Sequence, residues 1–224
     1  MTHPGGASRV GDTRGRRHAA LLVSVAAVFA WAAIAPRDRF TFWLEVAPAL
    51  VALVAIAATY RRFPLTDLTY ALAALHACVL FVGGHYTYAE VPAFNWLRDV
   101  GLLARNDYDK VGHFVQGFVP AIVIREVLVR TSPLRPGKWL AFLVVSVATA
   151  ISALYEMIEW WVGAASGSAG DAFLGTQGYV WDTQSDMFLC LVGACVALAT
   201  LSRVHDRALA RVGANASVTA PPAR

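Results

Sequence analysis

The sequence predicts an all-α protein: a polytopic membrane helix bundle of about six transmembrane helices, with the N- and C-termini cytoplasmic. Three observations lead to this fold class. Charged residues make up only 15% of the 224 residues, whereas a soluble domain usually carries about a quarter. Several apolar runs approach the roughly 20 residues that cross a hydrocarbon core as a helix. Lys and Arg gather in alternate connections between these runs, which is the pattern of cytoplasmic loops.

Six apolar runs are long enough to span a bilayer, and they must be helical because every backbone amide in lipid needs a partner within its own segment. They cover residues 19–35, 42–60, 68–84, 111–129, 139–158 and 183–202. The first run could instead be a cleaved signal peptide, because Arg16 and Arg17 precede it and it ends in Ala33-Ile34-Ala35. Cleavage there would leave Pro36 at the new N-terminus, and the run exceeds a usual h-region. We therefore expect a retained anchor.

The flanking and connecting segments complete the domain organisation. We expect a disordered cytoplasmic arm at 1–17, a single six-helix transmembrane domain at 18–203, and a flexible cytoplasmic tail at 204–224, because both ends lack a sustained apolar period. Two longer connections form outer loops at 85–108 and 162–182. The first is rich in aromatic residues that suit the headgroup region, and 94–103 is predicted to form a short interfacial helix.

The basic residues set the orientation. With the N-terminus inside, fourteen of the 19 Lys and Arg residues fall in cytoplasmic segments and five fall outside. The net charge of +4 does not indicate nucleic-acid binding, because these residues lie between the apolar runs and form no basic face. The bilayer is the expected partner. The three cysteines lie inside apolar runs without metal-ligand spacing, so we interpret them as small core residues.

Polar side chains recur at the outer ends of three predicted helices. The three sets, each with the i, i+4 or i+3 spacing of one helix face, are Asp109, His113 and Gln116; Ser152, Glu156 and Glu159; and Asp182 and Asp186. The predicted topology brings all three sets to the same depth of the membrane. We therefore expect them to converge.

The cost of placing charge in lipid decides how these residues are oriented. An ionised carboxylate at mid-bilayer costs about 2.5–3.5 kcal/mol, so the deeper members should turn inward toward each other, a water-filled cleft or a cation. The predicted catalytic residues are His113, Glu156, Glu159 and Asp186. The predicted substrate-binding residues are Lys110, Asp109, His85, Tyr88 and Glu90. The predicted ligands of a divalent metal are His113, Glu156, Asp182 and Asp186.

Structural roles compete with this interpretation. The three polar sets could simply join three helices through hydrogen bonds, and Asp182 could be the N-cap of the last helix. His76 is expected to be a core histidine bonded to a neighbouring helix, and Glu45 to snorkel toward the outer surface. Arg125 and Glu126 are expected to form a local ion pair at the cytoplasmic headgroups.

The residue types allow two kinds of chemistry. His with Glu and Asp is a suitable ligand set for Zn²⁺ or Mn²⁺, whereas carboxylates alone favour Mg²⁺ or Ca²⁺. General acid–base catalysis by His113 with a carboxylate partner is equally compatible with the pattern. The sequence contains no HExxH motif, no GxSxG elbow and no P-loop. Neither the presence of a metal nor its identity follows from these motifs.

Four motifs in order resemble the YjdF-like family of bacterial inner-membrane proteins: GGHYTYAEVPAFNWLRD (83–99), RNDYDKVGHFVQGFVPA (105–121), SALYEMIEWW (152–161) and FLGTQGYVWDTQSDMFL (173–189). The DK-x-x-H element at 109–113 is also similar, over a short stretch, to VanZ-like proteins linked to glycopeptide resistance. The YjdF-like family carries no established reaction. The resemblance implies a multi-pass protein of the bacterial inner (cytoplasmic) membrane in which the four motifs form one feature.

Three functions are compatible with the sequence, which leaves open whether the protein is an enzyme. The first is a membrane-embedded hydrolase or transferase that acts from the outer leaflet on a lipid-linked or envelope substrate. The second is a non-enzymatic scaffold or helper in which the polar cluster only fixes helix packing. The third is a small transporter, which the apolar lower halves of the last three helices disfavour. The sequence sets neither the substrate nor the oligomeric state.

Overall fold

A computed structural model describes residues 5–166 and 180–219, and all regular structure in these ranges is helical. Seven helices form in chain order: α1 (Gly5–Ala32), α2 (Arg39–Thr59), α3 (Asp67–His85), α4 (Pro92–Asp99), α5 (Tyr108–Thr131), α6 (Lys138–Ser166) and α8 (Asp182–Thr219). The all-α class is confirmed, and each of the six predicted apolar runs lies largely within a helix. Helix α4 falls where we predicted a short interfacial helix. Part of the expected outer loop 162–182 belongs to α6, and 167–179 lies outside the described residues.

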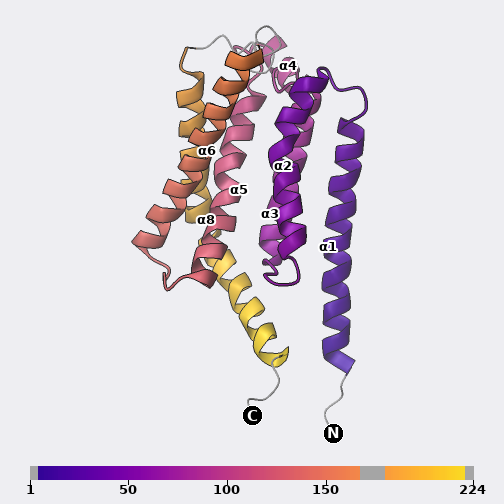
Figure 1. The fold of residues 1–224 in the computed structure, drawn as a ribbon, viewed down its shortest axis with the longest axis vertical. Coiled ribbons are helices and arrows are strands. Elements are labelled where there is room, and N and C mark those ends of the chain that lie inside the picture. The colour runs from indigo at the N-terminus through magenta and orange to yellow at the C-terminus, as the bar shows by residue number, and fades with distance from the viewer. Residues whose placement is uncertain (1–4, 167–179, 220–224) are drawn as a thin grey trace.

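Six long helices run side by side along the bundle (Figure 1). Helices α1 and α2 pack on α3, helices α6 and α8 pack on α5 and on each other, and the contact between α3 and α5 joins the two halves. The short helix α4 lies at one end of the bundle, while α1 begins and α8 ends at the opposite end (Figure 1). The start of α1 and the end of α8 therefore lie at the same end of the bundle.

Five of these helices are long and apolar enough to cross a membrane: α2, α3, α5, α6 and α8. Helix α1 contains the first predicted span but differs from the other five. Its helical apolar stretch runs only from Ala19 to Ala32 and follows a basic segment that includes Arg14 and Arg17. This stretch is shorter than the roughly 20 residues of a usual span. Helix α1 nevertheless packs along α3.

Both chain ends are more helical than the sequence suggested. Helix α1 already begins at Gly5, within the arm for which we expected disorder, and α8 continues to Thr219, through most of the expected flexible tail. Side chains near these ends are held by the rest of the bundle. Arg14 Nε lies 2.7 Å from Asp67 Oδ1 at the start of α3, and Arg125 in α5 bonds Asp206 in α8. Arg, which is frequent in both segments, also favours helix.

The closest helix packing in the bundle joins α5 and α8, and it depends on two glycines. A Cβ atom added to Gly117 in α5 would lie 1.8 Å from the carbonyl oxygen of Cys190 in α8. A Cβ added to Gly193 in α8 would lie 2.1 Å from the carbonyl oxygen of Phe114 in α5. No larger residue fits at either place without moving a backbone. Small residues allow membrane helices to approach in this way. The contact brings together the ends of α5 and α8 that lie near α4, which we call the outer ends after the predicted orientation.

Which side of the membrane each end occupies remains a prediction from the Lys and Arg distribution. Green fluorescent protein fused after Arg224 should fluoresce in cells, and alkaline phosphatase fused after Gly101, between α4 and α5, should be active. Fluorescence and phosphatase activity of paired fusions at both sites measure the orientation. The opposite pattern at both fusion sites would show that the bundle is inverted.

The glycine contact predicts a position-dependent effect of a single methyl group. Gly117→Ala should lower the free energy of unfolding by about 1–3 kcal/mol or more, because the added Cβ overpacks a backbone contact. Gly15→Ala in α1 is the matched control, since nothing lies within 4 Å of its added Cβ, and it should be neutral or stabilising. Unfolding in sodium dodecyl sulfate, followed by circular dichroism, measures both. Equal effects of the two substitutions would contradict the described packing.

Candidate functional site

Lys110, in the first turn of α5, is the centre of a charged group at the end of the bundle near α4. Its Nζ lies 3.0 Å from Asp182 Oδ1 and 2.9 Å from Asp186 Oδ1, both in the first turns of α8. It also lies 3.5 Å from Asp109 Oδ2 on its own helix. Lys110 therefore holds the outer ends of α5 and α8 together. Asp182 is the first residue of α8 and not the N-cap residue before it. Its side chain forms an ion pair with Lys110.

Arg105 supplies a second cation from the connection between α4 and α5. Its Nη2 lies 3.3 Å from Asp182 Oδ1 and 3.7 Å from Asp109 Oδ2, and its Nε donates to Asp107 over 2.8 Å. Arg105 was not among the predicted site residues: it lies four positions before Asp109 but in the connection that precedes α5, outside the predicted helix. Only the fold of the connection brings it to the cluster.

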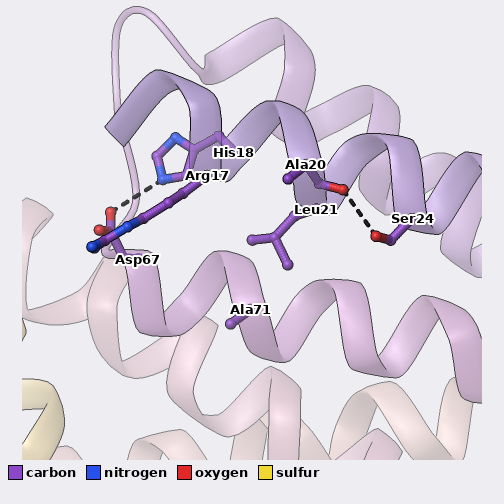
Figure 2. Close-up of a pocket in the computed structure, with 7 residues that line it drawn as sticks. All are labelled: Arg17, His18, Ala20, Leu21, Ser24, Asp67 and Ala71. Atoms are coloured by element: carbon purple, nitrogen blue, oxygen red, sulfur yellow. Dashed lines mark hydrogen bonds and ion pairs between the residues drawn. The ribbon is translucent and has the colours of Figure 1, made fainter. Parts of the chain in front are cut away.

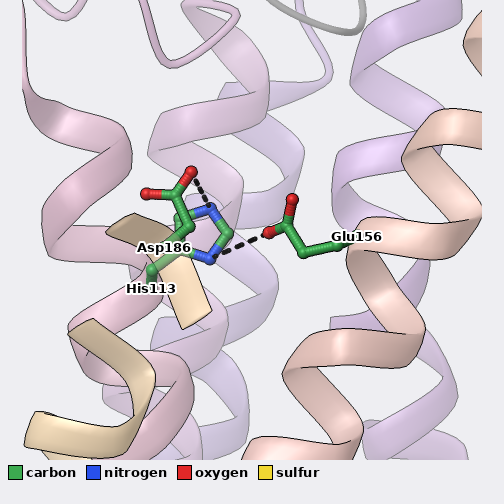
Figure 3. A group of neighbouring side chains, drawn as sticks. All are labelled: His113, Glu156 and Asp186. Atoms are coloured by element: carbon green, nitrogen blue, oxygen red, sulfur yellow. Dashed lines mark ion pairs between the residues drawn. The ribbon is translucent and has the colours of Figure 1, made fainter. Parts of the chain in front are cut away.

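His113 lies one turn deeper, between α6 and α8 (Figure 3). Its Nδ1 lies 3.0 Å from Gln116 Oε1, to which it can donate, and 3.8 Å from Glu156 Oε1. Its Nε2 lies 3.6 Å from Asp186 Oδ2. Donation from Nδ1 to Gln116 leaves the lone pair of Nε2 directed at Asp186. The predicted convergence of His113, Glu156 and Asp186 from three helices is thus present in the structure.

The cluster is buried and carries more negative than positive charge. Asp186 is 3% exposed, Glu156 is 7% exposed, and Glu156 Oε1 has no hydrogen-bond partner among the described residues. Four carboxylates, on Asp109, Asp182, Asp186 and Glu156, face two fixed cations, Lys110 and Arg105. A proton or a cation among them would lower the repulsion.

Two groups of donor atoms in the cluster are compact enough to surround one metal ion. His113, Glu156 and Asp186 form the first group, and Asp109, Asp182 and Asp186 the second; within each, the donor atoms lie within 4.8 Å of one another. Three of the four predicted metal ligands fall in the first group, and Asp182 falls in the second. The first group is the better candidate for Zn²⁺ or Mn²⁺, since it combines an imidazole with carboxylates.

Four predicted site residues lie apart from this cluster. His85 Nδ1 bonds the carbonyl oxygen of Ala32 at 2.8 Å and so joins the ends of α3 and α1. Glu90 lies half exposed on the outer loop and pairs with Arg37 at 3.1 Å. Glu159 is half-buried in α6 and makes no hydrogen bond or ion pair with the described residues. The fourth, Tyr88, is buried beside α3 and α5.

Tyr88 fills a slot that two glycines leave open. A Cβ on Gly83 would lie 2.3 Å from the Tyr88 ring, and one on Gly112 would lie 3.0 Å from it. The Tyr88 backbone has φ = 55°, which is uncommon outside glycine. Burial, followed by the negative charge of Glu45, raises the pKa of Tyr88 well above its usual value. Tyr88 therefore remains a neutral phenol.

Two predictions about isolated polar residues are wrong. Glu45 does not snorkel: it is 9% exposed, and the hydroxyl of Tyr155 in α6 donates to its Oε2 over 3.1 Å. Such a contact was not visible in the sequence, because Glu45 and Tyr155 are 110 positions apart. His76 makes no hydrogen bond through Nε2 within the described ranges, so the expected bond to a neighbouring helix is not found.

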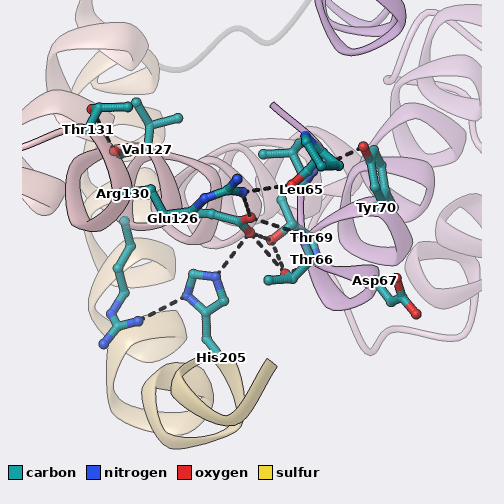
Figure 4. A network of polar contacts seen from close by, with 12 residues as sticks. Leu65, Thr66, Asp67, Thr69, Tyr70, Glu126, Val127, Arg130, Thr131 and His205 are labelled. Atoms are coloured by element: carbon teal, nitrogen blue, oxygen red, sulfur yellow. Dashed lines mark hydrogen bonds and ion pairs between the residues drawn. The ribbon is translucent and has the colours of Figure 1, made fainter. Parts of the chain in front are cut away.

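The expected headgroup ion pair between Arg125 and Glu126 is also wrong, because both residues are buried and belong to a polar network at the other end of the bundle. Figure 4 shows Glu126 and His205 in this network. Arg125 bonds His205 Nδ1 and Asp206 in α8. Glu126 is fully buried and accepts from five groups: Thr66 N, Thr66 Oγ1, Thr69 Oγ1, Arg130 Nη1 and His205 Nε2. Because the carboxylate oxygens of Glu126 accept this many hydrogen bonds, the network fits a structural role.

A groove of about 370 Å³ lies between α1 and α3 (Figure 2). Its lining is mainly apolar, with His18 and Asp67, 3.1 Å apart, at one end. None of the residues of the outer cluster lines it. We assign it no chemical role.

The fold and the buried outer cluster define a polytopic membrane protein with charged side chains gathered at one end of its bundle. Residues 17–207 match the family model described as a predicted membrane protein (DUF2238), and the chain belongs to this family. It is 50% identical to the inner membrane protein YjdF of Escherichia coli (strain K12) over 186 aligned residues. The aligned region covers 83% of this chain and 89% of the relative. No solved structure matches the chain. The resemblance to YjdF-like proteins and the inner-membrane location are thereby confirmed.

The ion pairs of Lys110 predict a strong stability effect. Lys110→Met should lower the free energy of unfolding by about 3 kcal/mol, because Asp182 and the buried Asp186 lose a direct cationic partner. The double variant Lys110→Met/Asp186→Asn should recover part of this loss, since it removes one of the uncompensated charges. Thermal unfolding in detergent measures both variants.

Arg98→Met is the matched control for this measurement. Arg98 pairs with Asp99 on the exposed surface of α4, where loss of an ion pair costs about 0–1 kcal/mol. A Lys110→Met protein as stable as Arg98→Met would show that the outer ends of α5 and α8 are not held by this contact.

Proposed function

We propose that His113, Glu156 and Asp186 form a catalytic centre that acts from the outer leaflet as a hydrolase or transferase on a lipid-linked or envelope substrate. The observation that carries this proposal is the orientation of His113. In the tautomer in which Nδ1 donates to Gln116 Oε1, 3.0 Å away, Nε2 keeps its lone pair and lies 3.6 Å from Asp186 Oδ2. An imidazole fixed in one tautomer by a neighbouring acceptor is suited to take up a proton or to bind a metal.

The roles follow from the distances. His113 Nε2 is the general base, and Asp186 at 3.6 Å stabilises the imidazolium that forms when the base takes up a proton. Glu156, at 3.8 Å from the other ring nitrogen, is the second acid–base group. Lys110 and Asp109, one turn above, contact the polar part of the substrate. These separations exceed hydrogen-bond length, and catalytic contacts often tighten only when substrate is present.

A divalent metal ion fits the same group. The cluster has more carboxylates than basic side chains, which favours binding of a cation. Glu156 Oε1 is buried and has no hydrogen-bond partner among the described residues, so it is available as a metal ligand. His113, Glu156 and Asp186 would hold the ion and leave a position for water. When bound, such an ion lowers the pKa of that water toward neutrality. An acidic site would also need a cation of this kind to accept an anionic headgroup.

The surroundings of the cluster support access from the outer leaflet. Three exposed tryptophans lie near it, at the end of α6 and just before α8: Trp160, Trp161 and Trp181. Indole rings gather at the membrane–water interface, so the cluster lies close to headgroup depth. A substrate with its polar part at this depth reaches His113 without crossing the bilayer.

The second candidate function is a scaffold in which the cluster only fixes packing. It is favoured by the ion pairs of Lys110, which link α5 and α8 directly. A transporter is less well supported. Below the cluster, α5, α6 and α8 enclose an apolar core that includes Ile122, Val144 and Ala194. A polar path through the protein would have to pass this layer.

Substitution of His113 separates the first two functions. His113→Gln should reduce turnover roughly 10²- to 10⁴-fold, the usual contribution of a general acid or base, with little change in thermal unfolding. Turnover is measured by mass spectrometry of lipids extracted from bacterial membranes and incubated with the purified protein, with added Zn²⁺ or Mn²⁺. Glu90→Gln, which alters an exposed ion pair away from the cluster, should leave turnover unchanged.

A lipid profile that is the same with the unmodified protein and with His113→Gln would argue against catalysis. A large loss of stability in His113→Gln would then identify the cluster as structural. Elemental analysis of the same preparations adds a separate readout: a stoichiometric metal that disappears in Glu156→Gln supports the metal-binding role of the site.

A further inference from the structure

A second set of oxygen-bearing side chains lies between α2 and α6 near the outer end of the bundle. The set consists of Glu45, Tyr88, Tyr155 and Glu159, and we call it the Glu45 group. Tyr155 donates to Glu45 over 3.1 Å. A Cβ on Gly84 of α3 would lie 3.3 Å from Glu45 Cβ, and one on the adjacent Gly83 would lie 2.3 Å from the Tyr88 ring. Glu159 follows Tyr155 by four positions, on the same face of α6. The group shares no residue with the proposed catalytic centre around His113.

The oxygen atoms of the Glu45 group accept few hydrogen bonds. The hydroxyl of Tyr88, a residue that is 7% exposed, is buried and has no hydrogen-bond partner among the described residues. Within these residues Glu45 receives one hydrogen bond, from Tyr155, and Glu159 receives none. A carboxylate has about four acceptor positions, so the group has several oxygen lone pairs available to a ligand.

The group also lacks a cation. Lys110 and Arg105 pair with aspartates, whereas Glu45 and Glu159 form no ion pair with any described residue. Carboxylates buried within a membrane bundle are costly unless they are paired or protonated. A positively charged ligand would satisfy both the charge and the free acceptors.

The group is largely buried at the place where α2 and α6 meet. Helix α2 packs mainly on α3, and α6 packs on α5 and α8, so the Tyr155–Glu45 hydrogen bond connects two helices that scarcely touch elsewhere. Apolar side chains near the group are exposed on α6: Leu154 and Ile158. A lipid headgroup would approach between α2 and α6 with its chains in the bilayer.

We propose that Glu45, Glu159 and Tyr88 form a binding site for a primary ammonium group, presented by an outer-leaflet lipid headgroup or by a free amine. A primary ammonium has three N–H donors and no acceptor. The two carboxylates and the phenol oxygen of Tyr88 offer three acceptors at one place. Tyr155 positions Glu45 through its hydroxyl. A quaternary ammonium has the same charge but no N–H donor and should bind less well.

The test compares a lipid that has a primary ammonium headgroup with one that has a quaternary ammonium headgroup. The full-length protein in detergent is titrated with dioctanoyl phosphatidylethanolamine or dioctanoyl phosphatidylcholine, and binding is followed by tryptophan fluorescence. We expect roughly tenfold tighter binding of the ethanolamine lipid, the effect of a charged hydrogen bond. Glu45→Gln and Glu159→Gln should each abolish the preference. Glu159→Gln is the safer variant, because Glu159 makes no bond that folding depends on.

Two controls distinguish this site from the proposed catalytic centre and identify the source of the amine. His113→Gln should keep the preference for the ethanolamine lipid, and Glu90→Gln should keep it too. Free ethanolamine that competes with the lipid would show that the amine alone is recognised, whereas lack of competition would identify the lipid as the ligand. Equal binding of the two lipids, or a preference that survives Glu159→Gln, would overturn the proposal.

Discussion

The close contact of α5 with α8 is the constraint on which the rest of the structure depends. Gly117 and Gly193 each face a backbone carbonyl of the other helix and leave no room for a side chain. The outer cluster and the inner network are both built on this pair of helices. Lys110 meets Asp186 on one side of the contact, and Glu126 meets His205 on the other. A small change in the distance between the two backbones would therefore alter both polar groups together.

The two polar groups differ in how completely their atoms are used, and this difference separates structure from function. Glu126 at the inner end accepts from five donors and is fully buried. At the outer end, Glu156 Oε1 and the Tyr88 hydroxyl are buried without a partner among the described residues, and carboxylates outnumber cations. Satisfied polar groups fix a fold, whereas unsatisfied ones need a ligand, a proton or water. We therefore place the proposed binding and chemistry at the outer end.

Much of this architecture could be predicted from the sequence, because hydropathy and helical spacing are local properties. The six apolar runs became six helices, and the spacing of His113, Glu156 and Asp186 placed them on faces that meet. The sequence could not tell which helix lies opposite each face. The partner of Glu45 is 110 positions away, and that of Glu126 in α8 is 79 positions away. Local spacing carries no information about such pairs, so these residues were expected at the lipid surface.

The wide separation of these partners along the chain has a consequence for biogenesis. Helix α5 carries Lys110 at one end and Arg125 and Glu126 toward the other, and several of their partners lie in α8, which leaves the ribosome after α5 and α6. Until α8 has been synthesised, those charges lack part of their compensation, and unpaired charges in lipid are unfavourable. We expect α5 to remain near the translocon, or in contact with an insertion factor, until α8 arrives. Completion of the bundle is then a late and concerted event.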